Sequence, residues 1–226
     1  TPSRVLFATR QGSMCTAKCA RCIGAALYPL ALISILCNIV LFFPDGKTKY
    51  VTEEREGYGQ RITEEVKYMG GLVGGGLMVL VPAIHIQMTG KDGCCGNRCG
   101  VTSVRCLRSS RLPLQMFLSI LFAAVGVAGA LYSFTVAVMG LVNGPTCRTI
   151  LLWSTPFKGM EAKDSYLQNK NLWSLCTEPP NIVQFNIGLF STLVLTSILE
   201  LVLCGIQMIN GLFGCLCGTC KNKGVR

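Results

Sequence analysis

The sequence predicts an all-α integral membrane protein, a four-transmembrane-helix bundle with a disulfide-bridged larger extracellular loop. Half of the 226 residues are hydrophobic, and only 14% are charged. Three long ranges contain no charged residue and a fourth contains only Glu200: 22–44, 68–90, 112–147 and 179–220. Each is long enough to cross the roughly 30 Å of bilayer hydrocarbon, which takes about 20 helical residues. A water-soluble domain, a disordered chain and a nucleic-acid binder are therefore excluded, although the net charge is +10.

Each predicted element follows from one of these ranges and from the residues that break helices at its ends. Helices are expected because lipid cannot satisfy free backbone amides. Pro44 and Pro145 stop helices, and Pro113 suits a first helical turn. The chain begins with Thr1, and we expect the natural start at Met14, with residues 1–13 as an upstream extension. The predicted order is a cytosolic N-terminal segment (1–22), a span (23–43), a small extracellular loop (44–68), a span (69–88), a cytosolic Cys-rich basic loop (89–111), a span (112–142), a large extracellular loop (143–181), a span (182–213) and a cytosolic tail (214–226).

The sides of the membrane are predicted from the distribution of charge. Segments 1–22, 89–111 and 214–226 together carry twelve basic residues and one acid, whereas the two other loops carry nine of each. Basic residues gather in the loops that stay in the cytosol. Both termini are therefore predicted to be cytosolic.

Two cysteines, Cys147 and Cys176, lie in the loops that are predicted to be outside. Cysteines in an oxidising compartment usually pair. We predict a disulfide between them, the alternative being two free thiols. The bridged loop would form a small subdomain with aromatic side chains, which we interpret as a partner-binding surface.

Ten further cysteines lie on the predicted cytosolic side, close to the membrane. Thiols in this position are accessible to reversible palmitoylation. Two other interpretations stay open: a zinc site, because Cys19-x-x-Cys22 and Cys217-x-x-Cys220 both lie at inner helix ends, and inert reduced thiols. We expect palmitoylation, with no metal and no cofactor. The lipidation candidates are Cys15, Cys19, Cys22, Cys94, Cys95, Cys99, Cys106, Cys215, Cys217 and Cys220.

Three polar side chains fall inside the predicted spans: Asn38, His85 and Glu200. A carboxylate in the bilayer must face the protein interior or be protonated. Counting about 1.5 Å per residue from the outer helix ends places Glu200 and His85 at similar depth, with Asn38 nearer the outer face. We therefore favour a hydrogen bond or ion pair between Glu200 and His85. The alternative is that each is satisfied by a local backbone, Ser or Gln group.

The second predicted span is rich in glycine. Small residues allow helix backbones to approach closely in lipid. We interpret these positions as internal packing of the bundle, with homo-oligomerisation as the alternative. They are Gly70, Gly71, Gly74, Gly75 and Gly76.

No catalytic set is visible. The chain has one His and lacks paired carboxylates in the spans and a phosphate-binding loop after a strand,. We therefore expect no enzyme. A small channel or transporter using His85 and Glu200 is the alternative function, although such proteins usually place polar groups on several helices.

Seven motifs, spread in order from about 14 to 220, resemble the L-six branch of the transmembrane-four superfamily. This branch is tetraspanin-like in topology but distinct from true tetraspanins, in which the Cys-Cys-Gly motif lies in the large outer loop. The charge distribution here places Cys94-Cys95-Gly96 in the cytosol. The motifs are MCTAKCARCIG (14–24), NIVLFFP (38–44), GGGLM (74–78), GCCG (93–96), NGPTC (143–147), LWSLCTEP (172–179) and ELVLCGIQMING (200–211).

The resemblance implies a non-enzymatic plasma-membrane organiser, also found in endosomal or lysosomal membranes. Such a protein would bind integrins, tetraspanins or growth-factor receptors laterally and influence cell adhesion, migration and proliferation. The resemblance also implies palmitoylation near the inner face and a disulfide in the outer loop.

Overall fold

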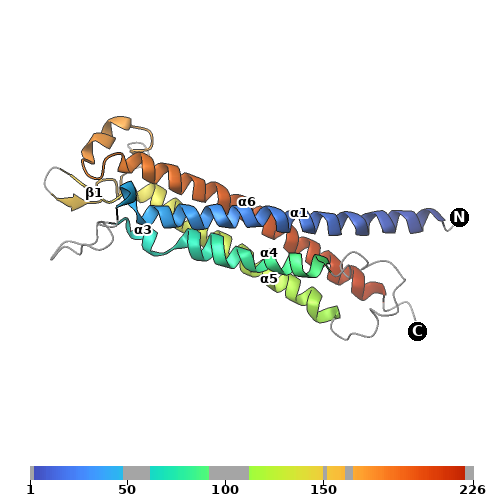
Figure 1. The fold of residues 1–226 in the computed structure, drawn as a ribbon. Coiled ribbons are helices and arrows are strands. Elements are labelled where there is room, and N and C mark those ends of the chain that lie inside the picture. Colours follow the sequence, from blue (N-terminus) through green and yellow to red (C-terminus); the bar gives the residue numbers. More distant parts are fainter. Residues whose placement is uncertain (1–2, 48–61, 92–111, 150–151, 161–164, 222–226) are drawn as a thin grey trace.

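The protein is a long bundle of helices with a small folded head at one end (Figure 1). In this computed structural model, the described residues are 3–47, 62–91, 112–149, 152–160 and 165–221. Within these described ranges, four helical segments are long and apolar enough to span a membrane: Ala20–Phe42, Glu64–Met88, Leu118–Asn143 and Ile182–Leu212. The predicted fold class is confirmed, because these four spans occur together with a disulfide between Cys147 and Cys176.

The first helix, α1, runs from Ser3 to Phe42, and the 3-10 turn η1 (Pro44–Gly46) follows it. The helix ends here because a residue that precedes proline is disfavoured in the α conformation. Phe43 accordingly has non-helical dihedral angles, with φ −119° and ψ 66°.

The second span is built from three pieces: α3 (Glu64–Lys67), a π-helix η2 (Gly70–Met78) and α4 (Val79–Lys91). Met69, between α3 and η2, is left-handed with φ 48°. A π-helix bonds residue i to i+5 and is wider than an α-helix. The sequence analysis predicts one span here but not its division into three segments.

The third span, α5, runs from Leu112 to Asn143 and ends at Gly144, which has φ 73°. A left-handed glycine is a common end to a helix. After the head, α6 runs from Ile182 to Lys221. The N-terminal part of α1 and the C-terminal part of α6 lie at the same end of the bundle, and the head lies at the opposite end (Figure 1).

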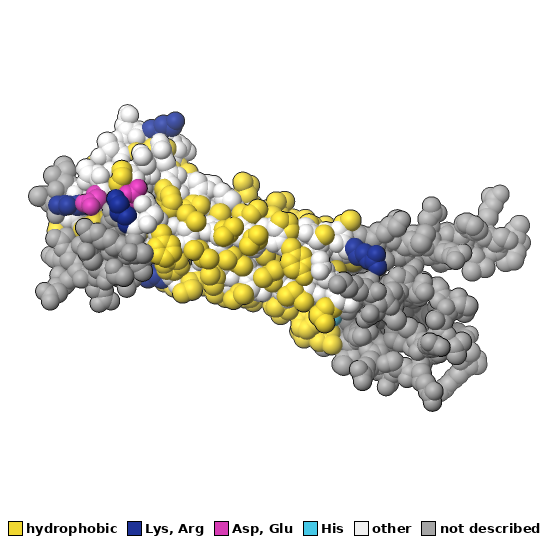
Figure 2. Space-filling view, in the orientation of Figure 1, with side chains coloured by type: hydrophobic (Ala, Val, Ile, Leu, Met, Phe, Trp, Pro, Cys, Tyr) yellow, Lys and Arg dark blue, Asp and Glu magenta, His cyan; other side chains and the backbone are white. Residues whose placement is uncertain are grey.

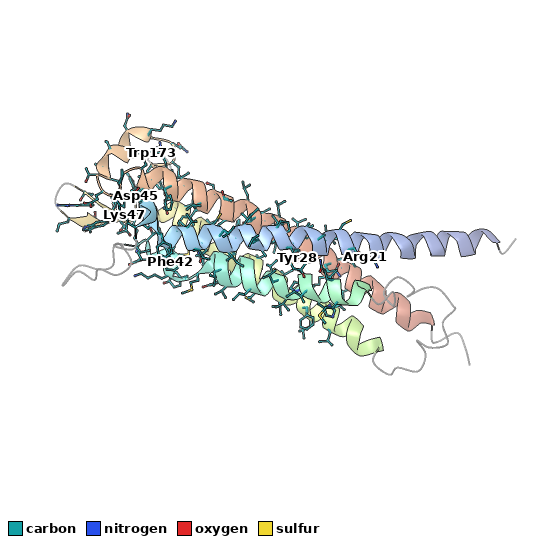
Figure 3. All side chains as sticks on the ribbon, in the orientation of Figure 1. Arg21, Tyr28, Phe42, Asp45, Lys47 and Trp173 are labelled. Atoms are coloured by element: carbon teal, nitrogen blue, oxygen red, sulfur yellow. A yellow bond between two sulfur atoms is a disulfide. The ribbon has the colours of Figure 1, made fainter. Side chains whose placement is uncertain are left out.

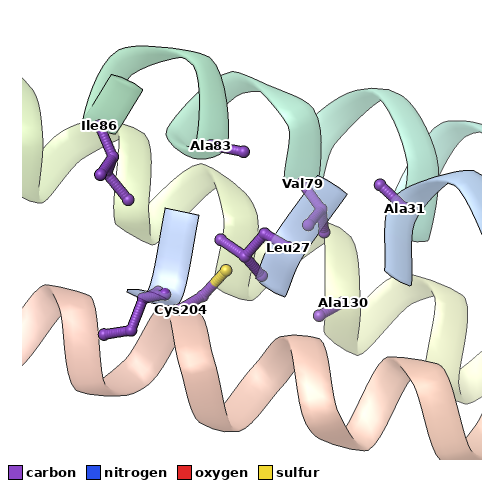
Figure 4. Packing of buried hydrophobic residues seen from close by; sticks show 8 residues of the cluster. Leu27, Ala31, Val79, Ala83, Ile86, Ala130 and Cys204 are labelled. Atoms are coloured by element: carbon purple, nitrogen blue, oxygen red, sulfur yellow. The ribbon is translucent and has the colours of Figure 1, made fainter. Parts of the chain in front are cut away.

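Three apolar clusters form the core. In the half of the bundle away from the head, small side chains alternate with larger ones, such as Ala31 and Ala83 beside Leu27 and Val79 (Figure 4). Toward the head, Phe190 and Leu193 of α6 pack with Leu41 and Val66. The third cluster lies inside the head and the start of α6. On the face shown in Figure 2, apolar side chains cover the middle of the bundle, as expected for a surface in lipid.

Candidate functional site in the loop head and the bundle interior

We call the described part of the segment between α5 and α6 (144–149, 152–160 and 165–181) the loop head. It contains the strands β1 (Cys147–Arg148) and β2 (Trp153–Ser154), which pair antiparallel, and the 3-10 helix η5 (Lys170–Leu175). The Cys147–Cys176 disulfide, with Cα atoms 5.4 Å apart, joins β1 to the end of η5. The bridge thus closes the head close to the membrane spans.

Two stacked aromatic rings form the centre of the head. The ring centroids of Phe157 and Tyr166 are 4.4 Å apart, and each residue is only 1% exposed. Gly144 passes so close that a Cβ there would lie 2.9 Å from the Phe157 ring. This glycine is therefore required both by its positive φ and by the space available.

Hydrogen bonds fix the head to the end of the bundle. Tyr166 donates its hydroxyl to the backbone carbonyl of Leu141 in α5, and Trp173 donates its indole N–H to the carbonyl of Tyr166 at 2.8 Å. Burial, together with the nearby carboxylate of Glu65, raises the pKa of Tyr166 to about 12. The phenol therefore remains a hydrogen-bond donor at neutral pH.

The small loop is attached to the same end. The side-chain amide of Asn143 donates to Glu65 at 2.6 Å, and the backbone N–H of Thr146 donates to the hydroxyl of Thr63 at 3.4 Å. Glu65 is only 7% exposed, so its carboxylate needs a partner of this kind. The first contact joins the second span to the end of α5, and the second joins the residue before that span to the head.

Two of the aromatic side chains in the loop that we interpret as a partner-binding surface, Phe157 and Tyr166, are buried in the core of the head. Aromatic rings bury large apolar area, and a head of this size has few other residues for a core. Trp173 is half-buried. The exposed large apolar side chains are instead aliphatic: Leu152, Met160, Leu167 and Leu175.

Within the bundle, Glu200 of α6 is completely buried and lies against α1. The hydroxyl of Ser34 lies 3.0 Å from one carboxyl oxygen of Glu200 and 3.1 Å from the hydroxyl of Thr196. The other carboxyl oxygen of Glu200 has no hydrogen-bond partner and faces Gly75 of η2, where a Cβ would lie 3.1 Å away. The carboxyl therefore lies where α1, η2 and α6 meet.

The expected pair between Glu200 and His85 is wrong. The ring of His85 packs against Phe122, with centroids 4.8 Å apart, while Glu200 takes Ser34 as its partner. Counting depth from the helix ends fails because those ends are not level: Leu193, eleven residues into α6, lies opposite Gly71 at the start of η2. The alternative of a nearby Ser partner applies to Glu200.

Further polar side chains lie along the interior face of α6. Ser197 donates to the carbonyl of Leu193 at 2.7 Å and also lies 2.9 Å from the hydroxyl of Ser133 in α5.

Asn38 of α1, predicted as an intramembrane polar residue, is 1% exposed, and its side-chain oxygen has no partner. Other unpaired buried atoms among the described side chains are Asn186 Nδ2, Gln207 Oε1 and Asn210 Nδ2.

The five glycines of η2 are all buried and face three different helices. A Cβ on Gly74 would meet backbone atoms of α5, including the Ser133 nitrogen at 3.0 Å, and one on Gly71 would meet the Ser34 carbonyl of α1 at 2.7 Å. Gly70 and Gly76 would meet the side chains of Val136 and Ile35. The glycine run therefore lets η2 fit between α1 and α5.

Of the lipidation candidates, only the side chain of Cys22 is described, and it is exposed. The side chains of the other candidates fall outside the described residues: Cys15, Cys19, Cys94, Cys95, Cys99, Cys106, Cys215, Cys217 and Cys220. Among the described residues, no group of three His, Cys, Asp or Glu side chains is placed to hold a metal ion.

The sequence analysis missed two groups of polar contacts. Ser34 contacts both Glu200 and Thr196, and Asn143 donates to Glu65. Helical spacing gives a signal for the first group, since Ser34 and Asn38 are four residues apart, as are Thr196 and Glu200. Residues four apart share a helix face.

Comparison with known proteins gives a consistent result over nearly the whole chain. The model of the L6 membrane protein family matches residues 14–221. Human transmembrane 4 L6 family member 5 is 41% identical over 93% of this chain and 98% of its own. Human member 1 is 42% identical (92% and 96%), and rat member 4 is 41% identical (92% and 95%). No solved structure matches.

Proposed function

We propose that this chain, which belongs to the L6 membrane protein family, is a non-enzymatic organiser of the plasma membrane. Its task would be to bind other membrane proteins laterally and hold them in one patch of the bilayer. The partner classes are those that the family resemblance implies: integrins, tetraspanins and growth-factor receptors. Through them the protein would influence cell adhesion, migration and proliferation, with endosomal or lysosomal membranes as further locations.

The orientation in this proposal follows from charge. The twelve basic residues of 1–22, 89–111 and 214–226 favour the cytosol for both termini,. The even number of spans is consistent with that placement, since the ends of α1 and α6 lie together. The loop head then faces outward, where its disulfide is stable against cytosolic reductants.

The observation that carries the proposal is the surface of the loop head. Leu152, Leu167 and Leu175 are 49%, 39% and 44% exposed, although the head has its own packed and bridged core. We interpret these exposed leucines as the residues through which the head contacts other membrane proteins. Because the head is already folded around its own core, binding would cost little further conformational entropy.

Palmitoylation of the cytosolic cysteines completes the proposal. Cys22 is exposed at the inner end of the first span, where an acyl chain could enter the adjacent leaflet. Acyl chains would concentrate the protein with its partners, and the head would select among them by raising the effective concentration of weak contacts.

Proximity labelling in intact cells tests the role of the head. We expect Leu167→Ser combined with Leu175→Ser to remove most of the labelled neighbours, because two of the three exposed leucines are lost while the core stays intact. The matched control combines Gln168→Ser with Asn169→Ser, since these neighbouring exposed residues are already polar. Variants at equal surface abundance with the same neighbours would refute the organiser role of the head.

A second labelling experiment tests acylation. We expect Cys-to-Ser changes at the ten cytosolic cysteines to alter the set of neighbours, whereas Cys37→Ser, within the first span, should leave it unchanged. If the ten changes leave the neighbours as they were, acylation has no part in the function.

The alternative function is a small channel or transporter, with His85 and Glu200 as its intramembrane polar groups. The specific observation in its favour is the row of buried polar side chains on α6, including the unpaired oxygen of Glu200. Selective ion flux in proteoliposomes that Glu200→Ala abolishes would favour this function over the organiser.

A further inference from the structure

A groove lies at the head end of the bundle, between the last turns of α1 and the start of α6. Its volume is about 430 Å³. Ile39, Val40 and Phe43 line one wall, and Ile182 and Phe185 line the other. Val40 and Phe43 are 42% and 38% exposed, so α6 does not cover this face of α1. The groove is therefore an apolar recess between two membrane-spanning helices.

The backbone around the groove has a defined shape. Asp45, Gly46 and Asn181 all have left-handed φ angles, at 59°, 67° and 57°. Asp and Asn tolerate this conformation better than other side chains. Pro179 and Pro180, which also line the groove, have fixed φ angles that limit backbone movement,. The recess is thus present before any ligand binds.

The position of the groove restricts its occupant to a molecule of the bilayer. One of its helices leaves its apolar span at Phe42, and the other enters its span at Ile182. Figure 3 places Phe42, Asp45 and Lys47 together at this end of the bundle, far from Arg21. The walls therefore lie at the level of lipid chains and the rim at the level of lipid headgroups. A ligand here must be amphiphilic.

The rim favours a headgroup without charge. Asp45 lies in the rim, and Lys47 pairs with its carboxylate at 2.6 Å. These two charges of the described rim neutralise each other, so they give neither an anionic nor a cationic headgroup a net attraction. The carboxylate can still accept a hydrogen bond from a hydroxyl, because it has lone pairs beyond the one that Lys47 uses.

The volume favours one compact ligand. Pockets for single small molecules measure roughly 300 to 1,000 Å³, and this groove is at the lower end of that range,. A lipid with two long chains would leave most of its surface outside. We propose that the groove binds a membrane sterol, with its hydroxyl at Asp45 and its ring system against Val40, Phe43 and Phe185. This site is independent of the lateral-binding role proposed above.

Photolabelling tests the proposal. The full chain would be purified, reconstituted in phosphatidylcholine nanodiscs and exposed to a photoreactive cholesterol analogue, with the labelled peptides identified by mass spectrometry. We expect label on the peptides that contain residues 39–46 and 179–185. Val40→Trp would fill the groove and should reduce this labelling at least fivefold.

Leu36→Trp is the matched control, because Leu36 is 51% exposed and lies one turn earlier on the same face of α1, outside the groove. It should label like the unchanged protein. If Val40→Trp does not fold, Ile39→Trp is a second variant that fills the same groove. Equal labelling of a folded groove-filling variant and the control would overturn the proposal.

Competition distinguishes a sterol from other lipids. Excess cholesterol should abolish the label, whereas oleate, which is charged and has a single chain, should not. Cholesterol methyl ether, which cannot donate to Asp45, should compete at least fivefold less well, and Asp45→Ala should remove that difference. Competition by oleate equal to that by cholesterol would show an unselective acyl groove and overturn the assignment.

Discussion

The hydroxyl of Ser34 in α1 lies 3.0 Å from the carboxyl of Glu200 in α6, a contact that joins residues 166 positions apart. It connects the first and last spans of the bundle at a point where η2 contributes only glycine backbone. A polar contact of this kind specifies which helix faces meet, because apolar side chains alone pack in many registers in lipid.

A double-mutant cycle measures this contact. We expect Ser34→Ala and Glu200→Leu each to lower the free energy of unfolding, with a coupling of about 0.6 kcal/mol, the average for hydrogen bonds between membrane helices, and at most about 1.7 kcal/mol. The control cycle pairs Glu200→Leu with His85→Ala, which should be additive because the two residues have separate partners. Denaturation in mixed micelles provides the measurement, and coupling confined to the control cycle would contradict the structure.

Two glycines offer a matched test of helix packing. Gly74→Ala would place a Cβ 3.0 Å from the Ser133 backbone nitrogen, and backbone cannot move aside as a side chain can. We expect a loss of roughly 1 to 3 kcal/mol, typical of overpacking. Gly188→Ala in α6 meets nothing within 4 Å and should change stability by less than about 0.5 kcal/mol. Equal effects of the two changes on unfolding would be inconsistent with the close approach of η2 and α5.

Loss of the disulfide should affect the loop head before the bundle. The two bridged cysteines are 29 residues apart in the sequence. In the loop-entropy model a disulfide that closes a loop of this length stabilises the folded state by about 3.5 kcal/mol. On heating, we expect the variant that combines Cys147→Ala with Cys176→Ala to lose the near-UV circular dichroism of the stacked Phe157 and Tyr166 at a lower temperature than the unchanged protein does. The far-UV helical signal should persist, because the two clusters inside the bundle contain neither cysteine. Simultaneous loss of both signals would show that the head and the bundle unfold together.

Tyr166 makes the head sensitive to alkali. Its pKa is raised to about 12 by burial and by Glu65, whereas an unfolded tyrosine titrates near 10. Above pH 10 the unfolded state therefore loses the proton first, and stability falls between pH 10 and 12 by up to about 1.4 kcal/mol per pH unit. In an alkaline titration followed by tyrosinate absorbance, we expect one step near pH 12 that is missing in Tyr166→Phe. If that step titrates with the exposed tyrosines, Tyr166 is not buried in solution.

The four spans can be predicted from the sequence because the exclusion of charge from lipid acts on each segment separately. The predicted compartment of Cys147 and Cys176 rests on the same charge distribution, and the prediction of their disulfide, which the structure confirms, rests on that compartment. These predictions need no knowledge of which helices touch. Glu200 could likewise be recognised as a residue that must face the interior.

The partner of Glu200 could not be predicted in the same way, because it depends on where each helix begins. The first turns of α6 pack in the core of the head, with Ile182 and Val183 beside Cys147. The depth in the bilayer at which Ser34 meets Glu200 therefore cannot be obtained by counting residues from the helix ends. The core of the head depends equally on distant contacts, such as that between Tyr166 and Leu141.

The π-helical turns from Gly70 to Met78 set how the glycines of the second span face the neighbouring helices. A π turn holds about one residue more than an α turn, so deletion of one residue here would let a turn close as an α turn and would move the remaining glycines out of register with α1 and α5. The number of residues in this glycine run, and not only their small size, is therefore expected to be constrained.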